Sequence, residues 1–347
     1  MRSAQLAVIP VTVLSAGSLV LQGVKDSGLG PAPLEGVKAR IVIKLNLERQ
    51  IWHWSTSRAE LDEIISCTKD AITRWDLTRG KKGAVLKLAG SWASMDAGMR
   101  RGRDHPLVLG GTDGSIAMVD LSEARLRWLK KGHTRAIWSV GVSPSGGGVT
   151  TVGPVDDGPD DYVRLWRGTS GALLSSVRLG NGVNVSNVCW SDDGSLIATG
   201  EPGSIVSIFK PLRLELFARM EGVRRHSDAY EGNSVDWIAP TTIAACNGQP
   251  WGVNVWDIAT RTKRSFLETK ERVNSISWSR QSKLLAIASE SVYLWDPVSG
   301  RRTVLDGVAL QPGVGYSARF SRSGRYLAVQ LKDGSVEIRK VEYKSQQ

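Results

Sequence analysis

The segment GHTRAIWSVGVSPSGGGVTTVGPVDDGPDDYVRLW, residues 132–166, contains two markers that recur along this chain of 347 residues. The first marker is an apolar run that ends in Ser and turn-forming residues, here GVSPSGG at 141–147, and it predicts a strand that leads into a tight turn. The second marker is an alternating run that ends in Trp, here YVRLW at 162–166. Between the markers most repeats have a stretch of small residues, such as SLIATG at 195–200, which predicts a strand buried on both faces.

The second marker occurs seven times, and this repetition determines the fold class. The last residues of the seven runs lie 39 to 47 positions apart, with a mean of 44. The runs are AITRWD (71–76), SIAMVD (115–120), YVRLWR (162–167), IVSIFK (205–210), GVNVWD (252–257), SVYLWD (291–296) and SVEIRK (335–340). A period of this length is expected when each repeat forms one four-stranded blade. The sequence therefore predicts an all-β, seven-bladed β-propeller.

These repeats resemble those of the WD40-repeat family over roughly residues 40–343. Gly132-His133, the Ser-Pro-x-Gly turn and the final Leu-Trp follow one another in the order that the family shows. The resemblance implies a structural hydrogen-bond network of side chains, in which a buried His and Trp are satisfied and an Asp orients the imidazole. Its members would be His133, Thr150 or Thr151, Asp160 or Asp161, and Trp166. Only one repeat keeps Gly-His and three endings lack Trp, so the resemblance identifies no subfamily.

A closed ring requires a fourth strand in the last blade, because an open end would leave an unpaired edge strand. The seventh run stops at Lys340, and the seven residues that follow are too few for a turn and an outer strand. Residues 39–47, ARIVIKLNL, alternate between two faces. One face is predicted to contain Ile41, Ile43, Leu45 and Leu47, and the other Lys44 and Asn46. We expect the propeller to span residues 39–347, with the N-terminal strand completing the last blade.

Residues 1–38 are predicted to form an extension to the propeller. The apolar stretch at 6–23 is interrupted by Pro10 and by Ser, Thr and Gly, so a membrane span is not expected. Three interpretations stay open for it: an extra strand or capping segment, a targeting segment, and a disordered segment. No clear cleavage site follows the stretch, which disfavours secretion. We expect a cytoplasmic location, with a nuclear one as the alternative.

Patterns for catalysis and metal binding are scarce. The motifs of serine hydrolases, zinc proteases and nucleotide-binding proteins are absent. The three cysteines and four histidines lack the spacing of a metal site. Asp156, Asp157, Asp160 and Asp161 provide oxygens that suit calcium, but an acidic turn is the favoured interpretation. We expect no enzyme activity, no cofactor and no metal.

The net charge of +11 favours acidic partners, whether proteins or nucleic acid. Trp251 follows Gly248-Gln249-Pro250 in a turn that the resemblance places on the top face of the ring. There it is either an exposed anchor for a partner or folded over its own blade. Basic residues in loops predicted to open on the same face complete the candidate partner-binding surface: Lys130, Lys131, Arg135, Arg224, Arg225 and His226.

The resemblance implies a non-enzymatic scaffold that mediates protein–protein interactions as a monomeric unit of a multi-subunit assembly. The alternative is a basic propeller subunit of a nucleic-acid or ribonucleoprotein complex, which the net charge favours. Few aromatic residues are interleaved with the basic ones on the predicted top face, so a platform for stacking bases is not indicated.

Overall fold

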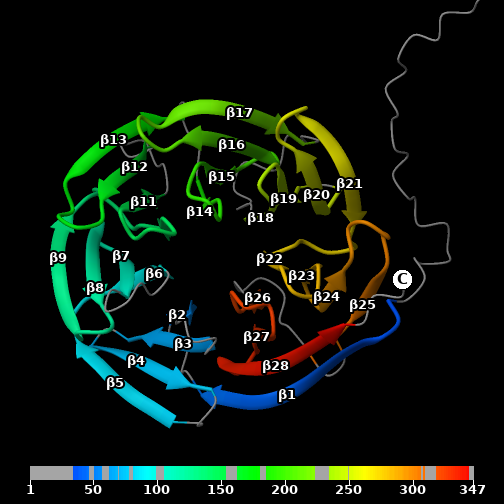
Figure 1. Cartoon of the computed structure of the whole chain (residues 1–347), viewed down its shortest axis with the longest axis horizontal. Coiled ribbons are helices and arrows are strands. Elements are labelled where there is room, and N and C mark those ends of the chain that lie inside the picture. Colours follow the sequence, from blue (N-terminus) through cyan, green and yellow to red (C-terminus); the bar gives the residue numbers. More distant parts are fainter. Residues whose placement is uncertain are drawn as a thin grey trace, which may run out of the picture.

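Seven four-stranded antiparallel sheets surround a common axis in the computed structural model of this protein (Figure 1). The structure describes residues 34–46, 51–56, 62–68, 70–77, 81–98, 105–153, 162–179, 185–222, 234–248, 250–305, 308 and 318–343. No helix occurs within these ranges. The predicted seven-bladed β-propeller is confirmed.

Within blades 1 to 6 the strands follow chain order from the innermost to the outermost. Blades 1 and 2 contain β2 (Ile51–Thr56), β3 (Asp62–Cys67), β4 (Ala71–Asp76), β5 (Lys81–Lys87), β6 (Trp92–Ala97), β7 (Pro106–Gly111), β8 (Ser115–Asp120) and β9 (Arg125–Lys131). Blades 3 and 4 contain β10 (Ser139–Val142), β11 (Gly148–Val152), β12 (Tyr162–Arg167), β13 (Leu173–Arg178), β14 (Asn187–Trp190), β15 (Ile197–Glu201), β16 (Ile205–Lys210) and β17 (Glu215–Glu221). Blades 5 and 6 contain β18 (Val235–Ala239), β19 (Thr242–Asn247), β20 (Gly252–Asp257), β21 (Thr262–Glu268), β22 (Ser275–Ser279), β23 (Leu284–Ala288), β24 (Val292–Trp295) and β25 (Arg302–Val304). Blade 7 contains β26 (Ala318–Phe320), β27 (Tyr326–Gln330), β28 (Ser335–Tyr343) and, as its outermost strand, β1 (Val37–Asn46).

The repeated sequence runs lie in the third strand of each blade, where apolar side chains reach the neighbouring blade. Ile72 of the third strand β4 and Leu107 of β7 are both fully buried in the cluster between blades 1 and 2. Val163 of β12 and Ile197 of β15 do the same between blades 3 and 4. The core is thus a ring of interfaces between blades, and each blade is stabilised by burial of apolar area against its neighbours.

Strand β1 closes the ring by pairing with β28 along its length, from Val37 opposite Tyr343 to Asn46 opposite Ser335 (Figure 1). Closure by an N-terminal strand is therefore confirmed. One detail of the prediction is wrong, because Ile41 does not share the buried face with Leu45: its side chain is 56% exposed, whereas that of Leu45 is 6% exposed. The register shifts between Ile41 and Ile43, and the extra residue of this β-bulge interrupts the alternation.

A series of hydrogen bonds links the innermost strands around the channel. Each innermost strand has one edge without a neighbouring strand, and its N–H groups there need an acceptor. Side chains of the preceding blade supply it at five described boundaries, where N···O distances are 2.7 to 3.2 Å. The acceptor and donor residues are Asp96 and Val142, Ser139 and Val188, Asn187 and Val235, Asp236 and Trp278, and Ser277 and Phe320. All five bonds run in the same direction around the ring.

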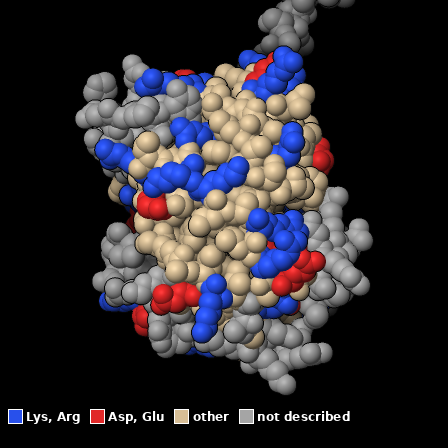
Figure 2. Space-filling view, turned by 90° about the vertical axis from the view of Figure 1, so that its left-hand side faces the viewer, with Lys and Arg blue, Asp and Glu red and all other residues tan. Residues whose placement is uncertain are grey.

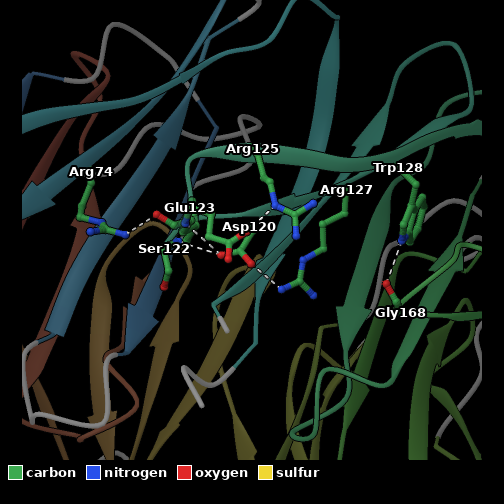
Figure 3. A network of polar contacts seen from close by, with 9 residues as sticks. Arg74, Asp120, Ser122, Glu123, Arg125, Arg127, Trp128 and Gly168 are labelled. Carbon is green, nitrogen blue, oxygen red and sulfur yellow. Dashed lines mark hydrogen bonds and ion pairs between the residues drawn. The ribbon is translucent and has the colours of Figure 1, made fainter. Parts of the chain in front are cut away.

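Blade 2 is also tied to its neighbours at the rim (Figure 3). The guanidinium of Arg74 in blade 1 donates to the backbone oxygen of Leu121, and the indole N–H of Trp128 donates to that of Gly168 in blade 3, at 3.0 and 2.8 Å. Asp120 accepts from Arg127 at 2.5 Å. Burial raises the pKa of Asp120, but this bond and those from backbone N–H groups outweigh it and leave the pKa below its usual value.

Candidate functional site

The two faces of the ring are formed by different loops. The loop after β9 packs on the β7–β8 turn, where the N–H groups of Gly132 and His133 donate to the backbone oxygen of Gly114. On the other side, Leu121 after β8 donates to the backbone oxygen of His105 before β7. We call the face with the loops between blades and the turns between second and third strands the top face, and the other the lower face.

The network predicted around His133 is partly within the described residues. His133 Nε2 lies 2.7 Å from the hydroxyl of Thr151, and the indole N–H of Trp166 donates to the same hydroxyl at 2.9 Å. Both His133 and Thr151 are buried. Thr150 faces the next blade, where its hydroxyl accepts from the indole of Trp190 at 3.0 Å. Asp160 and Asp161 lie outside the described residues, as do Asp156 and Asp157.

The predicted basic residues do not converge on one site in the described part of the chain. Lys131 is exposed and pairs with Asp113 of the adjacent turn, with Nζ 3.6 Å from a carboxylate oxygen. Lys130 extends along the rim, since a methyl group added at Gly171 in the β12–β13 turn would lie 3.2 Å from its Cε. Arg135 is exposed in the loop after β9. Arg224, Arg225 and His226 lie outside the described residues.

Figure 2 shows the part of the rim that contains β9, with Lys and Arg side chains spread among uncharged surface. The large apolar side chains of these outer strands are partly open to solvent, with Leu129 51% and Leu173 52% exposed. Several of the cations are paired, as Arg127 is with Asp120 and Arg125 with Glu123. This part of the surface is not a continuous basic patch of the kind that binds a phosphate backbone.

A cavity of about 780 Å³ occupies the channel, and Trp251 lines it. The turn before Trp251 is fixed by the side-chain amide of Asn247, which donates to the backbone oxygen of Pro250 at 2.7 Å. The backbone oxygen of Trp251 accepts from Thr269 at 2.9 Å, so the turn is joined to the loop before blade 6. The Trp251 side chain is half-buried, and its indole N–H is buried without a hydrogen-bond partner among the described residues.

A second tryptophan at the cavity, Trp138, was missed by the sequence reasoning. It is 45% exposed and directly precedes the innermost strand β10. Its backbone N–H donates to Val152 at 3.0 Å, and the preceding residue, Ile137, is fully buried. The signal was present in the sequence, because a Trp in the run IWSV after a predicted top-face loop has no place in the repeat pattern.

Charged side chains meet in the middle of the channel. Asp96, Asp236, Arg319 and Arg322 line the cavity, and both arginines interact electrostatically with both carboxylates. Burial raises the pKa of Asp236 to about 6, against the hydrogen bonds that it accepts from the backbone N–H groups of Trp278 and Trp237. Burial lowers the pKa of Arg319, while the two carboxylates oppose that shift. At the lower end, Arg280 pairs with Asp192.

The cysteines do not have the properties of nucleophiles. Burial raises the pKa of Cys67 and of Cys246 to about 12. Burial and the charges of Asp236 and Asp96 raise the pKa of Cys189 as well. Thiolates are therefore not populated near neutral pH at these positions.

Metal-binding clusters and membrane-spanning helices are both absent from the described ranges. No group of three or more His, Cys, Asp or Glu side chains is arranged to hold a metal ion in the part of the chain that the structure describes. The same residues contain no helix that is long and apolar enough to cross a membrane.

Comparison with known proteins supports the fold alone. No family model matches the sequence, and no curated protein matches it. Among solved structures, a chain from a crystal structure of a mitotic checkpoint complex is similar, with a TM-score of 0.66 and 14% sequence identity. The match covers 99% of this chain and 100% of that one. At this identity the likeness describes a shared architecture and carries no activity or partner.

Proposed function

We propose that this propeller is a non-enzymatic scaffold of the WD40-repeat type, which binds a protein partner on its top face around the mouth of the channel. The observation that carries the proposal is the pair Trp138 and Trp251, which line one cavity and are held by backbone hydrogen bonds. Half-exposed aromatic side chains on a rigid support are the usual anchors of protein–protein contacts. The three free cysteines fit the reducing cytoplasm.

The top face also contains complementary charges for such a partner. Lys131 and Arg135 are exposed near β9. This side of the ring lies opposite β21, which precedes the loop next to Trp251 (Figure 1). We propose that an acidic part of the partner contacts the side near β9. Rim charges of this kind increase the association rate more than the final affinity.

The test is recovery of partners with the tagged full-length chain, followed by mass spectrometry. Trp251→Ala is expected to weaken the main partner by about 2 kcal/mol or more, and the double variant with Trp138→Ala to remove it. Leu212→Ala is the matched control, because Leu212 is 84% exposed in the lower-face turn after β16. Loss of partners in the control, or full retention in the double variant, would contradict binding at the top face.

The alternative function, binding of nucleic acid, has a distinct signature in the same preparation. If RNA is held by neutralised phosphates, the logarithm of its affinity falls linearly with the logarithm of the salt concentration. Each neutralised phosphate adds roughly 0.7 to 0.9 to the magnitude of that slope, depending on strandedness. Replacement of Lys130, Lys131 and Arg135 by Ala would then remove the binding, while Trp251→Ala would leave it unchanged. That pair of results would favour the nucleic-acid function over the scaffold.

A further inference from the structure

Two buried polar atoms at the channel mouth have no hydrogen-bond partner in the described structure. One is the donor Nε1 of Trp251, and the other is the acceptor Oε2 of Glu271. Both side chains line the same cavity. Leaving a buried polar atom without a partner is unfavourable, so each of these atoms gains from a ligand that supplies the complementary group.

The two residues belong to one local unit. Thr269 donates its backbone N–H to Trp251 at 2.9 Å, and its hydroxyl donates to the backbone oxygen of Glu271 at 2.7 Å. The loop between β21 and β22 thereby holds Glu271 next to the β19–β20 turn. The unpaired donor and the unpaired acceptor are therefore presented together by blades 5 and 6.

Glu271 is the least hydrated charge at this side of the mouth. Glu271 and Glu290 both line the cavity, and neither forms an ion pair with a described residue. Burial first, and then the negative charge of Glu271, raises the pKa of the neighbouring Tyr293. Arg272 also lines the cavity, and both Arg272 and Glu290 are exposed and remain hydrated, whereas Glu271 is half-buried. A positively charged ligand is favoured here, in contrast to the basic side near β9.

We propose that this part of the mouth binds a cationic nitrogen and an adjacent carbonyl oxygen of a peptide. The inference rests on the proposed function, since the peptide is part of the protein partner. The cation donates to Glu271, and the carbonyl oxygen accepts from the Trp251 indole. An arginine side chain, a lysine side chain or an N-terminal ammonium group provides the cation, and a neighbouring backbone group of the peptide provides the carbonyl oxygen.

The experiment titrates short peptides into the ¹⁵N-labelled full-length chain and follows the NMR signals of the indole N–H groups. Trp251→Phe assigns the Trp251 signal by removing it. The probes are acetyl-Ala-Arg-Ala-amide, acetyl-Ala-Lys-Ala-amide, Ala-Ala-Ala-amide with a free N-terminus, and the neutral and acidic controls acetyl-Ala-Ala-Ala-amide and acetyl-Ala-Glu-Ala-amide. The cationic probe that shifts the Trp251 signal at the lowest concentration identifies the source of the cation. The neutral and acidic peptides are expected to leave the signal in place.

Glu271→Gln separates charge recognition from packing, because it keeps the shape of the side chain. We expect it to lower the affinity for the best cationic peptide about tenfold, equivalent to the loss of one charge-assisted hydrogen bond. Glu290→Gln should change that affinity less than about threefold. Melting temperatures of both variants check the fold. Three results would overturn the inference: equal affinity for the neutral peptide, unchanged affinity in Glu271→Gln, or no saturable shift with any cationic peptide. The last is tested at about 20 mM peptide, far above a millimolar dissociation constant.

The proposed function and this inference can fail separately. If Trp138 and Trp251 are required for partner recovery but no cationic peptide binds, the scaffold remains and the chemistry of recognition is different. If a cationic peptide binds at Glu271 while the partner is unaffected by the tryptophan variants, the mouth is a ligand site and the partner contacts another surface.

Discussion

Asp236 on β18 accepts a hydrogen bond from the backbone N–H of Trp278 on β22, with 2.7 Å between the carboxylate oxygen and the nitrogen. The bond crosses the boundary between blades 5 and 6 within the channel. The carboxyl group that makes it is the one that burial shifts to a pKa of about 6. This side chain therefore couples the stability of the ring to pH.

Lowering the pH from 7 to 4 is expected to stabilise the wild type relative to Asp236→Asn. The carboxyl group has a reference pKa of 3.8 when unfolded and of about 6 in the fold, so between these values the folded chain binds more protons. Its contribution to stability is fully present below about pH 4 and is lost as the pH rises through 6. Urea unfolding should show that the difference in free energy of unfolding, wild type minus variant, falls by about 2 to 3 kcal/mol as the pH rises from 4 to 7. A difference that stays constant or grows with pH would contradict the assignment.

The closing strand offers a matched pair of substitutions. Leu45→Ala should lower the free energy of unfolding by about 2 to 4 kcal/mol, because Leu45 is buried in the cluster between blades 7 and 1. Ile41→Ala, four residues earlier on the exposed side of the bulge, should change it by less than about 0.5 kcal/mol. Chemical denaturation of the two variants checks this order. Equal effects would mean that β1 pairs in a different register.

A stabilising substitution follows from comparing third-strand tryptophans. Trp75 donates to Ser66 at 3.0 Å and Trp166 to Thr151, whereas the indole N–H of Trp256 is buried without a partner in the part of the chain that the structure describes. In both blades the hydroxyl residue lies on the second strand, two positions after the residue that pairs with the tryptophan. Ala245 has the same position relative to Trp256, which pairs with Ile243.

Ala245→Ser should therefore raise the free energy of unfolding by about 1 kcal/mol through a new hydrogen bond to Trp256. Thermal or urea unfolding measures the gain. In the Trp256→Phe background the same substitution should bring no gain, because the donor is absent. A gain that persists there would have to come from something other than this bond.

His133→Ala should lower the free energy of unfolding by about 1 to 3 kcal/mol, because the Thr151 hydroxyl loses one of its two partners in a buried position. Partner recovery should be normal at temperatures where the variant remains folded. A variant that melts like the wild type but no longer recovers the partner would make His133 a contact residue instead.

The fold could be predicted from the sequence because its signal is local and repeated. The third strands carry the alternating runs, and the need to close the ring pointed to the N-terminal strand. Strand β6 had no marker, because WASMDA lacks the Ser-rich turn that follows most other innermost strands. The exposed position of Ile41 could not be predicted either, since a one-residue bulge leaves no trace in an alternating pattern.

The site was less predictable because it depends on which blades face each other across the channel. Asp96 and Arg319 are separated by most of the chain, and only closure of the ring brings both into the same cavity. Trp251 could be placed from its turn, but its unpaired indole could not. Glu271 gave no signal, because an acidic residue in a loop is usually solvated.

The register of the closing pair determines how the ring responds to mechanical force. Val37 lies opposite Tyr343, so the chain enters β1 and leaves β28 at the same end of the ladder. Tension between the two termini of the ring therefore loads the hydrogen bonds one pair at a time, as in opening a zipper, rather than all together in shear. The closure should therefore peel at low force, and optical-tweezer pulling from residues 37 and 343 would show the release of β1 as its first extension step.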